Sequence, residues 1–364
     1  MAQPLKELIN RGSVATLADG LAAAGRAFPR DRFVREAAAG LDGLELKDRV
    51  RHVAGVLATV LPERFPEAAR VIREAAGRVR LDLWSGWPAT EYVGVHGVGH
   101  LAEGMETLAV LTPYATGEFA VRPFLERHRE DALAIMTGWA RSEDEHVRRL
   151  ASEGTRPRLP WGARVRWLME PGPTLPILDL LRDDPSEYVR RSVANHVNDL
   201  AKDHPEFAVE VLRRWREEGG RHVDAVVRRA VRGLLRAGHP GALALVGAAP
   251  GVGAVEDLVL ESDRVAVGER LRFTVTISAE EPGPVVLRYA VRRDGSRRVF
   301  HLGERVAGRP GETFTITKAH SFRPVTTRVE PPGARLLEIV VNGTVRATAP
   351  FELVPAPEHA TSPS

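Results

Sequence analysis

A short motif, Val-Arg-Arg, recurs three times in this chain and constrains its fold more than any other sequence feature. The motif begins at residues 147, 189 and 227, so its copies are separated by 42 and then 38 residues. Apolar residues on either side keep the same register in each copy, which chance recurrence in an arginine-rich chain does not explain. We therefore predict consecutive structural repeats.

A repeat of about 40 residues is typical of HEAT and armadillo solenoids, in which each unit is a pair of helices. Segments such as 48–57 and 207–215 carry apolar residues at steps of three and four, and short Pro, Gly or Asp breaks separate such segments. We predict an α-solenoid of HEAT-like repeats over residues 1–253. Stacked helix pairs produce a long concave surface, which the second helices line.

After Gly253 the apolar pattern changes to a period of two. Alternating segments occupy residues 271–277, 285–291, 313–317 and 337–341. Asp294-Gly295 and Asn342-Gly343 are strong hairpin signals. About seven strands in a hundred residues predict an immunoglobulin-like β-sandwich over 254–354. The tail, residues 355–364, is expected to be disordered.

Composition narrows the class of protein. The 364 residues, 43% hydrophobic and 27% charged, are enough for more than one folded unit. The sequence contains no apolar run of about 18 residues, so no membrane span is predicted. The N-terminus lacks a secretory pattern. Cysteine is absent, which excludes disulfides, zinc–thiolate sites and cysteine nucleophiles and fits a reducing cytoplasm. We expect a cytoplasmic protein that acts as a monomer and has no membrane partner.

Positive charge in this chain is almost entirely arginine. The net charge is only +3, and the lysines are Lys6, Lys47, Lys202 and Lys318. Arginine makes planar, bidentate contacts with phosphate, but codon bias in a GC-rich genome also produces such an excess. The placement of the arginines must therefore decide whether nucleic acid is the partner.

Aligned repeats place three arginines at one equivalent position, namely Arg149, Arg191 and Arg229. One helical turn later, on the same face, come Glu153, Asn195 and Gly233. Such a row on a concave helical surface is suited to following a phosphate backbone. The alternative is that repeat arginines pair with Asp144 or Asp184 of a neighbouring repeat.

The repeat pattern breaks at residues 151–162, where two prolines, two arginines and a tryptophan follow a glutamate. Prolines stiffen the segment, so we expect Arg156, Arg158 and Trp161 to be held in place. A rigid basic loop with an indole can clamp a nucleic-acid backbone or cover a sugar or base. Alternatively, Trp161 packs between helices.

Two stretches, residues 147–161 and 188–205, resemble the motifs of the bacterial AlkC-type DNA alkylation repair glycosylases, relatives of the AlkD enzymes. The resemblance spans the helical half, and some members of that family carry an appended Ig-like domain. It implies excision of N3-methylated bases, 3-methyladenine and also 3-methylcytosine, from duplex DNA, without a metal or organic cofactor. The positions that match the family's site are Glu118 and Glu153 as active-site carboxylates, Trp161 as the active-site aromatic residue, and Arg149 and Arg156 near the DNA backbone.

The excision of a cationic base from deoxyribose is a reaction that two carboxylates can catalyse. An N3-alkylated adenine is a cation, so it leaves as a neutral base and needs no general acid. Positive charge then grows on the deoxyribose, and a fixed carboxylate stabilises that charge and can orient or deprotonate the attacking water. Without the resemblance, Glu118 after Thr116-Gly117 would be interpreted as an acid at a helix N-terminus.

Two other features are weaker. His96 and His100 are four residues apart with Glu103 and Glu106 nearby, but glycines interrupt the segment and tight helix packing explains it better than a metal site. The glycines do not form a dinucleotide loop, since no strand precedes them. In the sandwich, the tip at 292–298 carries four arginines, of which Arg293 and Arg297 are candidates for a minor-groove or backbone contact; a solvated turn is the alternative.

The sequence thus favours a monofunctional DNA glycosylase acting on cationic alkylated bases in duplex DNA. A non-catalytic HEAT scaffold that binds DNA or protein is the first alternative, and it predicts salt-dependent DNA affinity without base release. A family member that binds alkylated DNA without turnover is the second. A plain scaffold has no need of a stiff Arg-Pro-Arg-Leu-Pro-Trp loop beside a glutamate.

Overall fold

The computed structural model describes residues 4–25, 27–249, 252–324 and 330–356. The chain divides into two compact units, Met1–His204 with Trp215–Ala230, and Pro205–Arg214 with Val231–Ser364. This division does not test the predicted boundary at residue 253, which stays a prediction. Most of the predicted disordered tail, from residue 357 onward, lies outside the described residues.

Helices fill the described chain as far as Leu245, as the three- and four-residue apolar periodicity predicts. The helices are η1 (Leu5–Leu8), α1 (Arg11–Ala24), α2 (Arg30–Ala38), η2 (Leu41–Gly43), α3 (Leu46–Val60), α4 (Phe65–Ala76), α5 (Leu83–His96), α6 (Leu101–Leu111), α7 (Arg122–Arg127), α8 (Arg129–Trp139), α9 (Glu145–Gly154), η3 (Arg166–Met169), α10 (Leu175–Leu181), α11 (Glu187–Leu200), α12 (Pro205–Glu218), α13 (Val223–Ala230), α14 (Arg232–Ala237) and α15 (Pro240–Leu245). None of these helices is long and apolar enough to cross a membrane.

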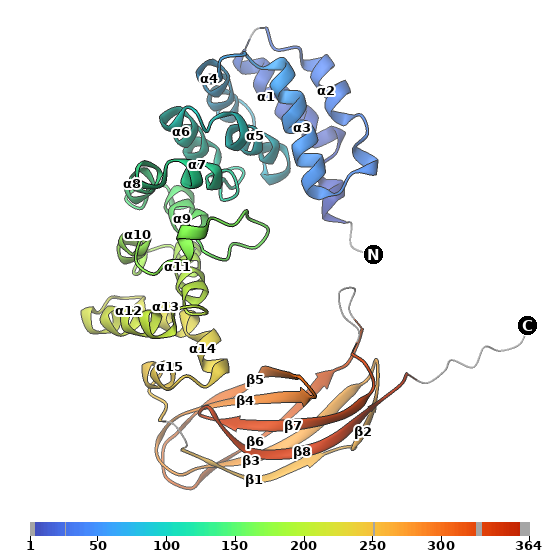
Figure 1. The fold of residues 1–364 in the computed structure, drawn as a ribbon, viewed down its shortest axis with the longest axis vertical. Coiled ribbons are helices and arrows are strands. Elements are labelled where there is room, and N and C mark those ends of the chain that lie inside the picture. The colour runs from blue at the N-terminus through green and yellow to red at the C-terminus, as the bar shows by residue number, and fades with distance from the viewer. Residues whose placement is uncertain (1–3, 26, 250–251, 325–329, 357–364) are drawn as a thin grey trace, which may run out of the picture. The chain divides into compact units, whose positions relative to one another are not determined.

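The first unit is a HEAT-like solenoid of two helix layers. Helices α3, α5, α7, α9, α11 and α13 follow one another in one layer, while α4, α6, α8 and α10 form the other. The connection between α9 and η3 projects from the first layer (Figure 1). A solenoid repeat buries its apolar faces against its neighbours. The exposed side of the first layer is therefore made of the polar faces of the second helix of each repeat.

Polar contacts between repeats fix the spacing of α9 and α11. Asp144 caps α9 by accepting hydrogen bonds from His146 N at 2.7 Å and Val147 N at 3.3 Å. The first arginine of the first motif, Arg148, forms a bidentate pair with Asp184 at 2.7 and 3.0 Å. The inter-repeat ion pair considered as an alternative therefore exists, but it uses Arg148 and leaves Arg149 for another role.

The third repeat differs from the alignment. Helix α13 ends at Ala230 and α14 begins at Arg232. Gly233 therefore does not lie one turn after Arg229 on the same helix, as the alignment predicted. The break falls at Val231, and Gly233 lies within the short helix α14.

The second unit contains an Ig-like sandwich of eight strands in its described part, one more than the sequence pattern predicts. The strands are β1 (Ala254–Leu260), β2 (Arg264–Ala266), β3 (Arg270–Ala279), β4 (Gly283–Arg293), β5 (Ser296–Ala307), β6 (Glu312–Ser321), β7 (Gly333–Val341) and β8 (Thr344–Val354). They form two sheets, β1-β3-β6 and β2-β8-β7-β4-β5. Apolar residues of both inner faces, such as Phe273, Leu287, Ile339 and Phe351, make the shared core. Strand β2 is too short for a period-two signal.

Both predicted hairpins are confirmed. Arg293 pairs with Ser296 across Asp294-Gly295, and Val341 pairs with Thr344 across Asn342-Gly343. Asn342 and Gly343 both have positive φ, 43° and 82°, which two-residue hairpins of this kind require.

Candidate active site

Glu153 lies at the C-terminal end of α9 and is only 6% exposed. Its Oε1 atom accepts from Arg156 at 2.6 Å and lies 3.6 Å from Arg149. Its Oε2 atom accepts from the hydroxyl of Ser192 on α11 at 2.7 Å. Both oxygens of this carboxylate are therefore fixed by donors from two neighbouring repeats.

Glu118 lies in the turn that precedes α7, and its carboxylate points to the same arginine. Its Oε2 atom is 2.7 Å from Arg149 and accepts from the hydroxyl of Thr116 at 2.8 Å. The turn ends before α7 begins at Arg122, so Glu118 is not in the first turn of a helix. Within the described chain, no hydrogen bond involves the other carboxylate oxygen, Oε1. The structure thus brings together the two carboxylates that the sequence singles out.

Alternating charges link these groups into one acid–arginine cluster. Its members, in order of contact, are Glu118, Arg149, Glu153, Arg156 and Asp199. The pair between Arg156 and Asp199 is 2.9 Å long. Lys202 also donates to Asp199 at 3.4 Å, so the three carboxylates of the cluster face two guanidiniums and one ammonium. A fixed negative charge in a partly desolvated site stabilises a cation placed beside it.

The aromatic ring of Tyr188 packs against Arg149 of this cluster. The guanidinium of Arg149 lies over the Tyr188 ring, 4.8 Å from its centroid, and His146 contacts the same ring edge-on at 5.6 Å. Arg149 is thus held by two carboxylates and one aromatic face, which orients it far more tightly than a surface arginine.

Electrostatics keep Glu153 ionised despite its burial. Burial raises the pKa of the Glu153 carboxyl, but the charges of Arg149 and Arg156 and the hydrogen bonds from Ser192 and Arg156 outweigh it, so the pKa lies below its ordinary value. The carboxylate is therefore negative at neutral pH, as electrostatic stabilisation of a cation requires.

A buried arginine fixes the loop from Thr155 to Val165 through hydrogen bonds to its backbone. Arg122 donates to the carbonyls of Gly154 and Arg156, each at 3.1 Å, and to that of Ala163. Burial lowers the pKa of Arg122 to about 10, so its guanidinium still carries a charge at neutral pH. We predicted that prolines would hold this loop; the hydrogen bonds show that Arg122 fastens it at both ends.

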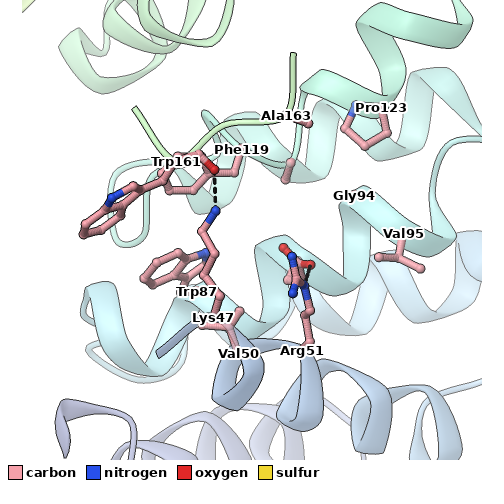
Figure 2. A pocket seen from close by; sticks show the side chains of 12 residues that line it. Lys47, Val50, Arg51, Trp87, Gly94, Val95, Phe119, Pro123, Trp161 and Ala163 are labelled. Carbon is pink, nitrogen blue, oxygen red and sulfur yellow. Dashed lines mark hydrogen bonds and ion pairs between the residues drawn. The ribbon is translucent and has the colours of Figure 1, made fainter. Parts of the chain in front are cut away.

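Trp161 lies at the tip of that loop, and its side chain is 62% exposed. It is therefore not an inter-helix packing residue. Its φ of 64° places a non-glycine residue in the left-handed region, a strained conformation that persists only where surrounding contacts impose it. Lys47 of α3 supplies one such contact, because its ammonium donates to the Trp161 carbonyl (Figure 2).

The other predicted contact residues have different surroundings. Arg158 forms a bidentate pair with Asp203 at 2.7 and 3.2 Å. Arg191 on α11 is exposed and makes no ion pair within the described residues, whereas Asn195 is half-buried and Arg229 exposed. In the sandwich, Arg297 donates to the buried Glu338 at 2.7 Å, and Arg293 is half-buried at the hairpin end.

The two histidines of the glycine-rich segment take part in ring packing. His96 stacks on Tyr92 at 4.7 Å and His100 stacks on Phe65 at 5.5 Å. A Cβ at Gly97 would lie 2.6 Å from Phe65, so this approach requires glycine. Among the described residues, no group of three or more possible ligands could hold a metal ion.

Sequence reasoning missed several residues of this site. Arg122, Ser192, Asp199 and Lys47 lie 30 to 115 residues from their partners in the chain, at separations of 32, 39, 43 and 114. For Asp199 a signal existed, because it lies two turns after Arg191 on the same face of one helix. No local pattern identifies the others.

Comparisons with known proteins agree with this geometry. A family model described as the C-terminal Ig-like domain of the uncharacterised protein YhaZ matches residues 254–355. The chain is 35% identical over 357 residues to the uncharacterized protein YhaZ of Bacillus subtilis (strain 168), which covers 96% of this chain and 99% of the relative. It is also similar to a solved structure of the Pseudomonas fluorescens alkylpurine DNA glycosylase AlkC bound to DNA with an abasic site analog, with a TM-score of 0.87 and 33% identity over 96% of this chain and 99% of that one.

Fold and site together define a HEAT-like repeat protein with an Ig-like domain and a buried acid–arginine cluster. Since the similarity to both relatives covers nearly the full length of each chain, this chain belongs to the AlkC-type family of DNA alkylation repair glycosylases, to which YhaZ is related.

Proposed function

We propose that this protein hydrolyses the N-glycosidic bond of cationic alkylated bases, 3-methyladenine and 3-methylcytosine, in duplex DNA, and that it does so without a metal or organic cofactor. The observation that carries the proposal is the sharing of Arg149 by Glu118 and Glu153, at 2.7 and 3.6 Å. Two carboxylates held close together in a partly buried site are suited to a sugar that becomes positive. The DNA bound to the AlkC relative supports the choice of DNA as substrate.

The proposed reaction begins with cleavage of the bond between C1′ and the base nitrogen. The bonding electrons leave with the alkylated base, which changes from a cation to a neutral molecule, and the deoxyribose becomes an oxocarbenium ion. Water then forms a bond to C1′ and loses one proton. The products are the free base, an abasic site and a proton.

We infer different roles for the two glutamates from their contacts. Glu153 has both oxygens occupied by donors, so it acts as a fixed negative charge next to the oxocarbenium ion. Glu118 keeps Oε1 available within the described chain, so it orients the water and takes its proton. Trp161, exposed at the loop tip, contacts the sugar or base of the distorted nucleotide.

The proposed backbone contacts involve polar residues of α11, α13, the Trp161 loop and the sandwich. Arg191, Asn195 and Arg229 follow the phosphates along α11 and α13, and Arg158 holds the segment beside Trp161. The hairpin residues Arg293 and Arg297 make a further DNA contact from the sandwich. Arg149 and Arg156, whose contacts are with carboxylates, set the charge of the site next to that backbone.

Release of bases from methylated duplex DNA, measured by chromatography, tests the proposal. The wild-type protein is expected to release 3-methyladenine, while Glu153→Gln and Glu118→Gln each lose about a hundredfold or more in rate, as loss of one electrostatic group costs elsewhere. Glu67→Gln on α4, which removes an exposed carboxylate, is the matched control and keeps full activity. Robust release by the Glu118→Gln, Glu153→Gln double variant contradicts the assigned chemistry, and DNA binding without release by the wild type supports the scaffold instead.

A further inference from the structure

Apart from Trp161, the residues that line a small pocket on the helical unit have no role in the chemistry described above. Helices α3 and α5, the turn before α7 and the loop that carries Trp161 enclose a volume of about 170 Å³. We call it the Trp87 pocket (Figure 2). Phe119, which lines it, is the residue next to Glu118 in the chain, and the pocket shares Trp161 with the proposed active site.

Aromatic faces form its walls. The rings of Trp87 and Phe119 are stacked, 5.6 Å apart with an interplanar angle of 26°, and the exposed Trp161 lines the rim. Trp87 is 6% exposed and its ring packs on Phe119, so Phe119 and Trp161 supply the aromatic surface on which a flat ring can stack. An apolar cavity of about 150 Å³ admits one benzene-sized molecule, so the volume of about 170 Å³ in the Trp87 pocket matches a single heterocycle.

Charge in the pocket disfavours a cation. The ammonium of Lys47 lies 5.6 Å from the centre of the Phe119 ring and donates to the Trp161 carbonyl. Figure 2 shows this side chain extending from α3 with the Trp87 indole beside it. Lys47 makes no ion pair within the described residues, whereas Arg51 is shared between Asp48 at 3.2 Å and Glu91 at 3.8 Å. Lys47 therefore supplies an unbalanced positive charge and two further N–H donors.

A purine or pyrimidine ring offers nitrogen and oxygen acceptors to those donors. An alkylated base in DNA is a cation, which Lys47 repels, but the same base is neutral once its bond to the sugar has broken. We propose that the Trp87 pocket binds the free, neutral base that the reaction releases. This inference rests on the proposed function, and it gives the enzyme a product site that prefers the base only after cleavage.

Binding of free bases to the full-length protein tests the inference without any DNA. Isothermal titration calorimetry with 3-methyladenine at pH 8 is expected to show saturable binding at one site. The cation 3,9-dimethyladeninium, which mimics the base before cleavage, is expected to bind about tenfold more weakly, a difference of about 1.4 kcal/mol. Lys47→Met is expected to abolish this preference, because it keeps the aliphatic stem and removes the charge.

A blocking variant locates the site. Val95 lines the pocket and is 62% exposed, so Val95→Trp fills the space from a position that is not in the protein core. It is expected to weaken binding of 3-methyladenine by about tenfold or more. Val110→Trp places the same indole on α6, outside the pocket, at a residue that is 37% exposed, and is expected to bind as the wild type does.

The affinity for abasic duplex DNA shows whether the pocket binds a released base or a base that is still part of the DNA. Val95→Trp is expected to bind such DNA as tightly as the wild type. Absence of saturable binding by the wild type, equal binding by Val95→Trp, or loss of DNA affinity in Val95→Trp each overturns the inference. An active enzyme that does not bind the free base refutes the product site alone, and an inactive protein that binds it refutes the proposed function alone.

Discussion

A single hydroxyl contributes to the ionisation of Glu153. Burial favours the protonated form of this carboxyl, and the charges of Arg149 and Arg156 and two hydrogen bonds reverse that preference. Ser192 supplies one of those bonds from α11, at 2.7 Å, and its oxygen also lies 3.0 Å from the hydroxyl of Ser152. In the proposed reaction Ser192 is a positioning residue, because its contact is with Glu153 and not with the sugar.

Ser192→Ala is expected to raise the pKa of Glu153, because it removes a donor that stabilises the charged form. Activity requires the ionised carboxylate, so the acid limb of the kcat/KM profile moves to higher pH and the loss of activity is largest on the acid side. The buried hydrogen bond to a charged group also contributes roughly 1.5 to 3 kcal/mol to stability. The pH profile of base release and the denaturant midpoint measure the two effects.

Ser142→Ala provides the control, since it removes a hydroxyl from the turn before α9 without touching Glu153. Its acid limb should coincide with that of the wild type. If the limb of Ser192→Ala also stays in place while the rate falls uniformly, the role of Ser192 is structural and the interpretation of its hydrogen bond is wrong.

At the scale of elements, Arg122 turns an irregular loop into a rigid one. Its guanidinium is 1% exposed and bonds three carbonyls at the two ends of the Thr155–Val165 loop. Arg122→Lys keeps the charge but cannot reach all three acceptors, because an ammonium lacks the planar fork. Local opening of the loop then becomes more frequent, and trypsin cleavage after Arg158 or Arg164 is expected to accelerate about tenfold or more.

The same substitution is expected to lower base release by about a hundredfold, since small misplacement of a positioning loop carries such a cost. Arg127→Lys on the exposed side of α7 leaves both rates unchanged and serves as the control. Circular dichroism verifies that the helices persist. Unchanged proteolysis in folded Arg122→Lys would show that the loop is held by other contacts.

Sequence patterns predict the elements of this protein well where the physical cause is local. The hairpins follow from Asp294-Gly295 and Asn342-Gly343, because the turn conformation, with positive φ at Gly295, Asn342 and Gly343, is set by adjacent residues. The solenoid follows from apolar periodicity and from the repeated motif. The break between α13 and α14 was missed, because alignment by one tripeptide carries no information on where a helix ends.

The active site is predictable only in part. Glu118 and Glu153 follow from the resemblance to a family, and the structure brings them together at Arg149. Their supports, Arg122 and Ser192, become neighbours of the site only when repeats stack, so no pattern within one segment identifies them. Arg156 and Arg158 show the reverse case, because the sequence located them but did not show that carboxylates of the next repeat neutralise them.

For the whole molecule, the net charge of +3 is too small to explain DNA affinity by itself. Binding must therefore depend on a few cations that carboxylates do not neutralise. Many arginines of the described chain are paired, as in Arg148–Asp184 and Arg158–Asp203. Arg191 differs, because it is exposed on the first helix layer without an ion pair among the described residues.

Arg191→Gln is expected to weaken binding to all duplex sequences alike, because phosphate contacts carry no sequence information. Each phosphate contact contributes about 0.9 to the slope of log K against log salt. The slope should therefore fall by about 0.9 in this variant, measured by fluorescence anisotropy at several salt concentrations. Arg70→Gln removes an exposed arginine that Glu74 already neutralises at 2.7 Å, so its slope should match that of the wild type. Equal slopes for Arg191→Gln and the wild type would mean that Arg191 does not contact the phosphate backbone, and the predicted arginine row would then consist of Arg229 and of Arg149, which pairs with carboxylates.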